Sequence, residues 1–240
     1  MDGARTELLI VTLARLLEGV RTVAVGAASP IPGAAALLAR AKSGGAVRVL
    51  MLGSIKHNSF TDGGRELFDC AAQGRIDAFF LGGGQIDGGA NINLVGLGDY
   101  PRLTHRFPGS FGSAYLYFLI PRVILFREEH SPRVLVPKVD FISSPGTSAP
   151  GIYRPGGPVA LVTGRCAFAF ADGRIRLASA HPGESAESIR AKTGFDYESP
   201  ATVPATPGPT AAERALLAGR VREEIAETYP RFAAAWAAAA

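Results

Sequence analysis

The first third of the chain alternates between two patterns of apolar residues. Apolar positions at helical spacing predict three helices, over Glu7–Leu17, Ala34–Lys42 and Arg65–Gln73. Short and nearly continuous apolar runs predict three buried strands, at Thr22–Gly26, Val47–Leu52 and Ile76–Leu81. Alternation of helices with such strands is typical of an open, mostly parallel sheet with helices on both faces. We therefore expect an α/β fold.

The later part of the chain is richer in strands. Apolar or alternating runs predict strands at Asn91–Val95, Val123–Phe126, Val134–Val136, Pro158–Thr163, Ala167–Ala171 and Ile175–Ala178. Asp172-Gly173 is a two-residue hairpin signal between the last two runs, so we expect an antiparallel element there. A helix is predicted over Glu184–Lys192, with Ser185 as its N-cap.

The C-terminal segment predicts a linker followed by a helix. Ser199–Pro209 contains four prolines, which favour an extended backbone. Thr210 then caps a helix over Ala211–Tyr229, with Glu213 at the capping-box position. We therefore expect a main domain over residues 1–198 and a linker with a helical extension over residues 199–240.

Composition and charge exclude several classes of protein. The 240 residues are 47% hydrophobic, which is enough apolar material to form a folded core. The longest apolar runs are far shorter than the ~20 residues that span a bilayer. The net charge of +4 comes from scattered basic residues, which argues against a nucleic-acid partner. The start of the chain, with Asp2 and Glu7, lacks the pattern of a secretory signal. We expect a cytoplasmic, soluble protein with neither a membrane nor a nucleic-acid partner.

Two glycine-rich segments are the strongest candidates for a binding site. Gly82, Gly83, Gly84 and Gln85 directly follow a predicted strand, and Asn91 lies shortly after them. Ligands of open α/β sheets bind at the carboxyl ends of strands. Glycine there lets backbone N–H groups approach a phosphate or thioester closely. The alternative is a tight turn that needs a positive φ.

The second segment, Pro108–Ala114, contains Gly109, Ser110, Gly112 and Ser113. Small residues at this density can form a backbone anion site or an oxyanion hole. The alternative is a loop that packs tightly against a neighbouring helix.

Other candidates for chemistry are few. His57 and His130 have polar neighbours, whereas His105 and His181 are isolated, and a lone histidine usually has a structural role. No serine lies in a G-x-S-x-G elbow. Cys70 and Cys166 belong to no disulfide framework, and no metal-ligand spacing is present, so we expect reduced thiols and no metal.

Five motifs in order resemble the β subunit of family I coenzyme A transferases, over about residues 20–197. They lie at Thr22–Leu38, Gly74–Asn93, Pro108–Ala114, Val123–His130 and Pro182–Gly194. The resemblance implies an α/β subunit that pairs with a homologous α subunit, usually as α2β2, and shares an active site at the interface. It also implies that coenzyme A moves between acyl groups through a glutamyl-CoA thioester.

The resemblance further assigns residues to the site. Acyl-CoA, the substrate, would bind at Gly82, Gly83, Gly84, Gln85, Asn91, Gly109, Ser110 and Ser113. The backbone around Gly112 would form the oxyanion hole.

One motif departs from the family at the position of its nucleophilic glutamate. That turn is Gly53-Ser54-Ile55-Lys56-His57-Asn58 here, and the first carboxylate after Val47 is Asp62, which is out of register. Two interpretations remain. The chain resembles steroid-ring-opening CoA hydrolases, with the essential glutamate on the α chain, or it is a catalytically reduced partner of the α subunit. His57 is a candidate general base or hydrogen-bond donor, and otherwise a loop residue. A sugar-phosphate isomerase or regulator is a third class, although no helix-turn-helix is present.

Overall fold

Three parallel strands organise the first part of the chain in the computed structural model, which describes residues 2–239. β1 (Thr22–Val25) pairs with β2 (Arg48–Met51) on one side and with β3 (Ala78–Leu81) on the other. α2 (Pro30–Lys42) connects β1 to β2, and α3 (Gly63–Ala72) connects β2 to β3. Because all three strands run in the same direction, the carboxyl ends of β2 and β3 lie at one edge of the sheet.

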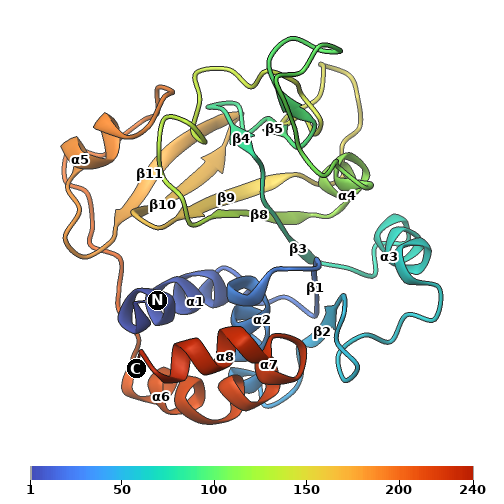
Figure 1. The fold of residues 1–240 in the computed structure, drawn as a ribbon, viewed down its shortest axis with the longest axis vertical. Coiled ribbons are helices and arrows are strands. Elements are labelled where there is room, and N and C mark those ends of the chain that lie inside the picture. The colour runs from blue at the N-terminus through green and yellow to red at the C-terminus, as the bar shows by residue number, and fades with distance from the viewer. Residues whose placement is uncertain (1, 240) are drawn as a thin grey trace. The chain divides into compact units, whose positions relative to one another are not determined.

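The helices of both ends of the chain pack together around α2. α1 (Gly3–Arg15) buries an almost continuous apolar run, Leu8–Ala14, and contacts α2. The C-terminal segment forms α6 (Ala211–Leu216), the π-helical turn η1 (Leu217–Val221), α7 (Arg222–Thr228) and α8 (Pro230–Ala237). Figure 1 shows α1 and α2 in blue beside these red helices. The predicted C-terminal helix and its Thr210–Glu213 capping box are confirmed.

The chain divides into two units by its internal contacts. The first unit contains residues up to Phe80 together with Pro207 onward, and the second contains Leu81–Thr206. The C-terminal helices thus belong to the same unit as β1, β2 and β3 up to Phe80. The domain boundary predicted at residue 198 stays a prediction.

The second unit is built on β8 (Arg122–Arg127), β9 (Pro158–Thr163), β10 (Cys166–Ala171) and β11 (Arg174–Ala180). β8 and β9 are parallel, whereas β9, β10 and β11 are antiparallel. Asp172 and Gly173 join β10 to β11 with φ values of +54° and +74°, so the predicted hairpin is confirmed. α5 (Ala186–Ala191) begins at Ser185, which forms a capping box with Ser188.

Shorter elements complete the second unit. β4 (Gln85–Ile86) pairs with β5 (Ile92–Asn93), β6 (Gly96–Leu97) pairs with β7 (His105–Arg106), and α4 (Ser113–Leu119) precedes β8. The strand predicted over Asn91–Val95 is therefore only two residues long.

The strand predicted over Val134–Val136 is wrong. These residues form a turn with one isolated bridge, between Leu135 and Ile86. Pro132 and Pro137 flank the run, and proline provides no N–H group for a longer ladder.

The α/β class is confirmed, with a mostly parallel arrangement in β1–β3 and β8–β9. Within residues 2–239, no helix combines the length and the apolar character needed to cross a bilayer.

Candidate functional site

The glycines after β3 are required by close packing. A Cβ atom on Gly82 would lie 3.0 Å from the carbonyl oxygen of Phe126, and one on Gly83 would lie 2.6 Å from Cγ2 of Ile92. A Cβ atom on Gly84 would overlap the ring of Phe107. None of the three has a positive φ; the tight turn of this segment lies after them, at 87–90, where Ala90 has a φ of +56°. Neighbouring groups approach this backbone so closely that only glycine fits.

Gln85 and Asn91 hold the segment after these glycines in place. Oε1 of Gln85 accepts hydrogen bonds from Nδ2 of Asn93 (2.7 Å) and from the N–H of Asp140 (3.0 Å). Nδ2 of Asn91 donates to Oδ1 of Asp87 (3.0 Å), and Oδ1 of Asn91 accepts from the N–H of Gly146 (3.1 Å). Both side chains are thus engaged within the unit, and their assignment to acyl-CoA binding stays a prediction.

The second glycine segment is an exposed turn at the start of α4. Gly109, Phe111 and Gly112 have φ values of +109°, +28° and +64°, and Phe111 is 74% exposed. Ser113 instead points inward, where its Oγ lies 3.1 Å from Oγ of Ser144. The alternative of a tightly packed loop therefore fits Ser113. It does not fit Gly109, where an added Cβ atom would have no neighbour within 4 Å.

The structure brings the two glycine segments together. Oη of Tyr117, on α4, donates a hydrogen bond to the carbonyl oxygen of Ala90 (2.8 Å). Ser144, which contacts Ser113, also forms a bridge with Ile92. Two segments that are about 20 residues apart in the sequence thus belong to one packed region of the second unit.

The turn after β2 lies in the first unit and has its own hydrogen-bond network. Gly53 has a φ of +89°, Ser54 is buried, and Ile55 is 90% exposed. The N–H of His57 donates to Oγ of Ser54 (2.9 Å), and the N–H of Met51 donates to the carbonyl oxygen of His57 (2.8 Å). No residue of this turn carries a carboxylate.

Two carboxylates nevertheless reach this turn from α7. Glu227 accepts hydrogen bonds from Ser54 and Ile55, and Glu224 lies beside His57. The sequence predicts a site role for neither residue, because Ser54 and Glu227 are 173 positions apart.

The other histidines have structural surroundings. His130 is buried, with Nδ1 2.8 Å from Oγ1 of Thr163 and Nε2 2.9 Å from Oγ1 of Thr193. Burial, assisted by the nearby Arg165, lowers the pKa of His130 to about 4. His181 is also buried, whereas His105 is exposed on β7.

The thiol nearest to a histidine is unsuited to nucleophilic attack. Sγ of Cys166 lies 3.8 Å from Nδ1 of His130, but burial raises the pKa of Cys166 to about 12. The thiol therefore stays protonated at neutral pH. Among residues 2–239, no three His, Cys, Asp or Glu side chains are grouped so that they could hold a metal ion.

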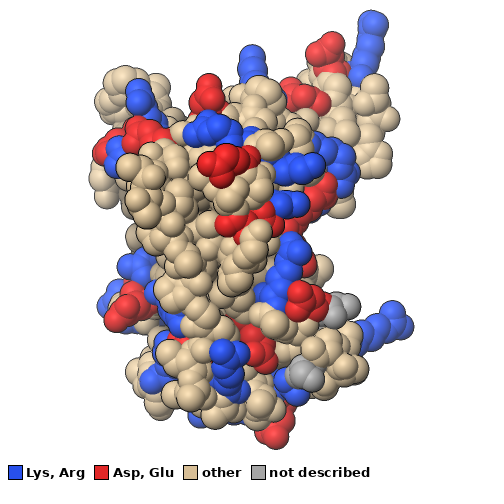
Figure 2. All heavy atoms as spheres, turned by 90° about the vertical axis from the view of Figure 1, so that its left-hand side faces the viewer, with Lys and Arg blue, Asp and Glu red and all other residues tan. Residues whose placement is uncertain are grey.

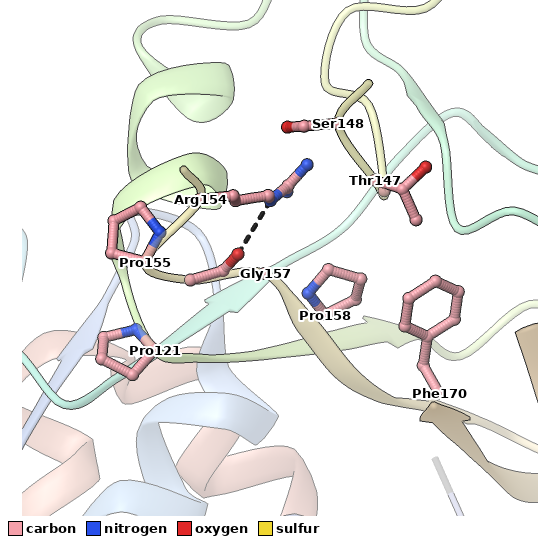
Figure 3. Close-up of a pocket in the computed structure, with 10 residues that line it drawn as sticks. Pro121, Thr147, Ser148, Arg154, Pro155, Gly157, Pro158 and Phe170 are labelled. Atoms are coloured by element: carbon pink, nitrogen blue, oxygen red, sulfur yellow. Dashed lines mark hydrogen bonds between the residues drawn. The ribbon is translucent and has the colours of Figure 1, made fainter. Parts of the chain in front are cut away.

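An open pocket of about 360 Å³ lies at the amino ends of β8 and β9, beside Pro121 and Pro158 (Figure 3). Arg154 extends across it but donates to three backbone carbonyl groups, those of Gly156 (2.8 Å), Pro145 (2.9 Å) and Tyr117 (3.0 Å). Burial lowers the pKa of Arg154. Ligands of α/β sheets bind at the opposite, carboxyl ends of strands, so this pocket is not the predicted acyl-CoA site.

Side chains of both charges are mixed on the surface in view. Figure 2 shows basic and acidic side chains interspersed on that face, without a broad area of one sign. Ion pairs of the second unit include Arg133 with Glu129 (2.6 Å) and Arg165 with Glu184 (2.7 Å). Glu129, directly after β8, thus has a structural role as an ion-pair partner.

Known proteins resemble this chain in sequence. A family model described as "Coenzyme A transferase" matches residues 3–190. The B-type subunit of 3-oxoadipate CoA-transferase from Pseudomonas knackmussii is 34% identical over 152 residues, which cover 60% of this chain. The B-type subunit of glutaconate CoA-transferase from Acidaminococcus fermentans is 34% identical over 128 residues, which cover 50% of this chain. The chain spans 58% and 47% of the lengths of these two relatives.

Solved structures resemble it in fold. The decarboxylase AibA/AibB superposes with a TM-score of 0.79 at 26% identity, over 100% of both chains. IpdAB from Rhodococcus jostii RHA1 superposes with a TM-score of 0.78 at 24% identity, over 90% of this chain and 93% of that one. The arrangement of strands and helices described above is therefore shared with both structures.

Proposed function

Because this chain belongs to the coenzyme A transferase family, as its motifs predicted, we propose that it is the β subunit of a heteromeric enzyme acting on acyl-CoA thioesters. The observation that carries the proposal is the match of the family model to residues 3–190, which include both glycine segments and the turn after β2. The two CoA-transferase relatives, both of the B type, support a partner of the α type. A cytoplasmic α2β2 heterotetramer is part of the proposal.

The glycine segments suit the binding of a thioester. Gly82 directly follows β3, at the edge of the sheet where open α/β folds bind ligands. Phe126, Ile92 and Phe107 fill the side of Gly82, Gly83 and Gly84 on which side chains would lie, so in the proposed site the pantetheine chain runs along the other side of this backbone. The backbone around Gly112 would stabilise an oxyanion at the thioester carbonyl.

The turn after β2 limits the chemistry that this chain can perform. In a transfer reaction, a carboxylate attacks the thioester carbonyl, the C–S bond breaks and coenzyme A leaves as a thiolate. The hydroxyl of Ser54 and the side chain of Ile55 cannot form the acyl anhydride that this sequence of steps requires. We therefore place the attacking carboxylate on the α subunit, for either CoA transfer or the hydrolytic C–C ring opening of a cyclic acyl-CoA.

A second candidate is a partner subunit that completes the α-subunit site without reacting itself. The hydrogen bonds of Ser54 favour it, because its hydroxyl already donates to Glu227 and accepts from His57. In this case the chain contributes pocket walls only.

Co-expression with an α-type partner tests the proposal. The purified complex is offered a panel of acyl-CoA esters, and reaction is followed by release of free thiol and by mass spectrometry of the products. Turnover by the complex is expected, and turnover of none of the esters contradicts the proposal.

Trapping then distinguishes the location of the nucleophile. Hydroxylamine or borohydride treatment during turnover should label no residue in the peptide 47–65 of this chain. A labelled peptide from this range would show that the nucleophile lies here.

A further inference from the structure

The turn after β2 is held by a helix that lies far away in the sequence. The N–H of Ile55 donates to Oε1 of Glu227 (2.6 Å), and Oγ of Ser54 donates to Oε2 of the same carboxylate (2.7 Å). Oγ1 of Thr228 donates to Oε2 as well (2.6 Å). Burial alone would raise the pKa of Glu227, but these hydrogen bonds and the nearby His57 lower it. Glu227 is therefore ionised at neutral pH, and its two oxygens fix the backbone of the turn.

The effect of Glu227 reaches His57 through Ser54. Oγ of Ser54 donates to Glu227 and at the same time accepts from the N–H of His57 (2.9 Å). The carbonyl oxygen of His57 in turn accepts from the N–H of Met51, the last residue of β2 (2.8 Å). Hydrogen bonds to an ionised acceptor are stronger than neutral ones, so the carboxylate determines the geometry of this network.

A second carboxylate on the same face of α7 lies beside the ring of His57. Oε2 of Glu224 is 3.4 Å from Nε2 of His57, which is an ion-pair distance without the alignment of a hydrogen bond. Oε1 of Glu224 accepts from Nε of Arg220 (2.7 Å), which fixes the carboxylate. Glu224 and Glu227 are three residues apart, so both face the turn.

We propose that α7 forms part of the active site of this chain, with Glu227 and Glu224 as positioning residues. Glu227 fixes the turn that replaces the family's nucleophile-bearing loop, and Glu224 holds Nε2 of His57 and so fixes the orientation of its ring. The inference rests on the proposed function, because it assigns these residues to an acyl-CoA site. It concerns a segment that lies outside the range matched by the family model, residues 3–190.

The local part of the inference is tested by hydrogen exchange in the intact complex. In Glu227→Ala, the amides of Ile55 and His57 should exchange about tenfold faster or more, as measured on a peptide covering residues 51–58. Glu227→Gln should change these rates less, because its carbonyl oxygen still accepts from Ile55. Glu223→Ala is the matched control, since Glu223 is exposed on the same helix and forms none of the contacts described above for Glu224 and Glu227. Equal exchange in Glu227→Ala and Glu223→Ala would overturn the inference.

The catalytic part is tested by kinetics with the best acyl-CoA of the panel. Glu227→Ala and Glu224→Ala should each lower kcat about tenfold or more with little change in KM, whereas Glu223→Ala should stay within about twofold of wild type. Glu227→Gln should recover part of the lost kcat, and it also covers the case in which Glu227→Ala folds poorly. If Glu224 acts through His57, adding Glu224→Ala to the His57→Ala variant should lower kcat little further.

The outcomes separate this inference from the proposed function. A wild-type complex that turns over no ester contradicts the proposed function, and the catalytic role of α7 falls with it. An active wild type whose kcat is unaffected by Glu227→Ala and Glu224→Ala overturns the inference alone. Fully additive effects of Glu224→Ala and His57→Ala would overturn the role assigned to Glu224.

Discussion

Replacement of Glu213 by glutamine should destabilise the first unit at neutral pH and leave it almost unchanged in strong acid. Glu213 is 3% exposed and accepts hydrogen bonds from Arg15 on α1 (2.8 Å) and Lys42 on α2 (2.7 Å). It also closes the capping box with Thr210. Glutamine preserves the shape and can still serve in a capping box, so the substitution removes mainly the charge.

The magnitude follows from the pKa of this carboxyl group. Burial alone would raise the pKa of Glu213, but the hydrogen bonds from Lys42, Thr210 and Arg15 outweigh it and lower the pKa to about 2, from 4.5. A shift of this size corresponds to ~3 kcal/mol of stability at neutral pH. The side chains of Arg15 and Lys42 are 29% and 42% exposed, so solvent screens part of the interaction. We therefore expect a loss of about 2 kcal/mol at pH 7.

The lowered pKa also predicts how the stabilisation by Glu213 changes with pH. A carboxyl group whose pKa is depressed by folding stabilises the protein above its unfolded value of 4.5, and this contribution disappears as the pH falls toward about 2. The difference between wild type and Glu213→Gln should therefore shrink steadily between pH 4.5 and pH 2.

Urea unfolding followed by tryptophan fluorescence measures this difference. Trp236 is the only tryptophan, and it is fully buried on α8, so it reports on the unit that contains Glu213. Glu223→Gln is a control, because it removes the same charge at an exposed position. An equal loss at pH 7 and at pH 2.5, or a loss no larger than that of the control, would refute the electrostatic argument.

Three further predictions concern the second unit. Folding lowers the pKa of His130 from 6.5 to about 4, so the unit should lose ~3 kcal/mol of stability as the pH falls from 6.5 to 4. Thermal unfolding followed by circular dichroism should show this loss, and His130→Gln should make the stability less dependent on pH. Gly83→Ala should destabilise the unit by about 2 kcal/mol or more in urea, because the new Cβ atom meets backbone and side-chain atoms, and an unchanged urea midpoint would contradict this. Gly173→Ala should lower the melting temperature through a loss of about 1 kcal/mol, since the hairpin requires a φ of +74°; an unchanged melting temperature would contradict this.

Local signals in the sequence predicted much of the fold. The helices after Ser185 and Thr210 begin where expected, because the hydrogen bonds of a capping box involve residues only three positions apart. The Asp172-Gly173 hairpin was equally predictable, since its turn type depends on these two residues. By contrast, α4 was not predicted, because it carries Tyr115, Tyr117 and Phe118, whose intrinsic preference is for strands.

The candidate site was predictable in position but not in detail. The glycines after β3 were found from the sequence, yet the need for them comes from Phe126, Ile92 and Phe107, which only the fold brings near. The contact of Glu227 with the turn after β2 has no local signal at all, because tertiary packing creates it. Acidic residues on an amphipathic helix are otherwise typical of a solvated face.

The first unit is made of two stretches of the chain, and the second unit lies between them in the sequence. This arrangement determines the order in which the two units can fold during synthesis. Leu81–Thr206 is continuous in the chain, so this unit can form as soon as it leaves the ribosome. The other unit cannot complete its core until α6, α7 and α8 emerge, about 130 residues after β3. Until then, the surfaces of α1 and α2 that these helices cover remain open to chaperones and to incorrect partners. The maturation of this protein therefore depends on helices that are translated long after the strands they help to stabilise.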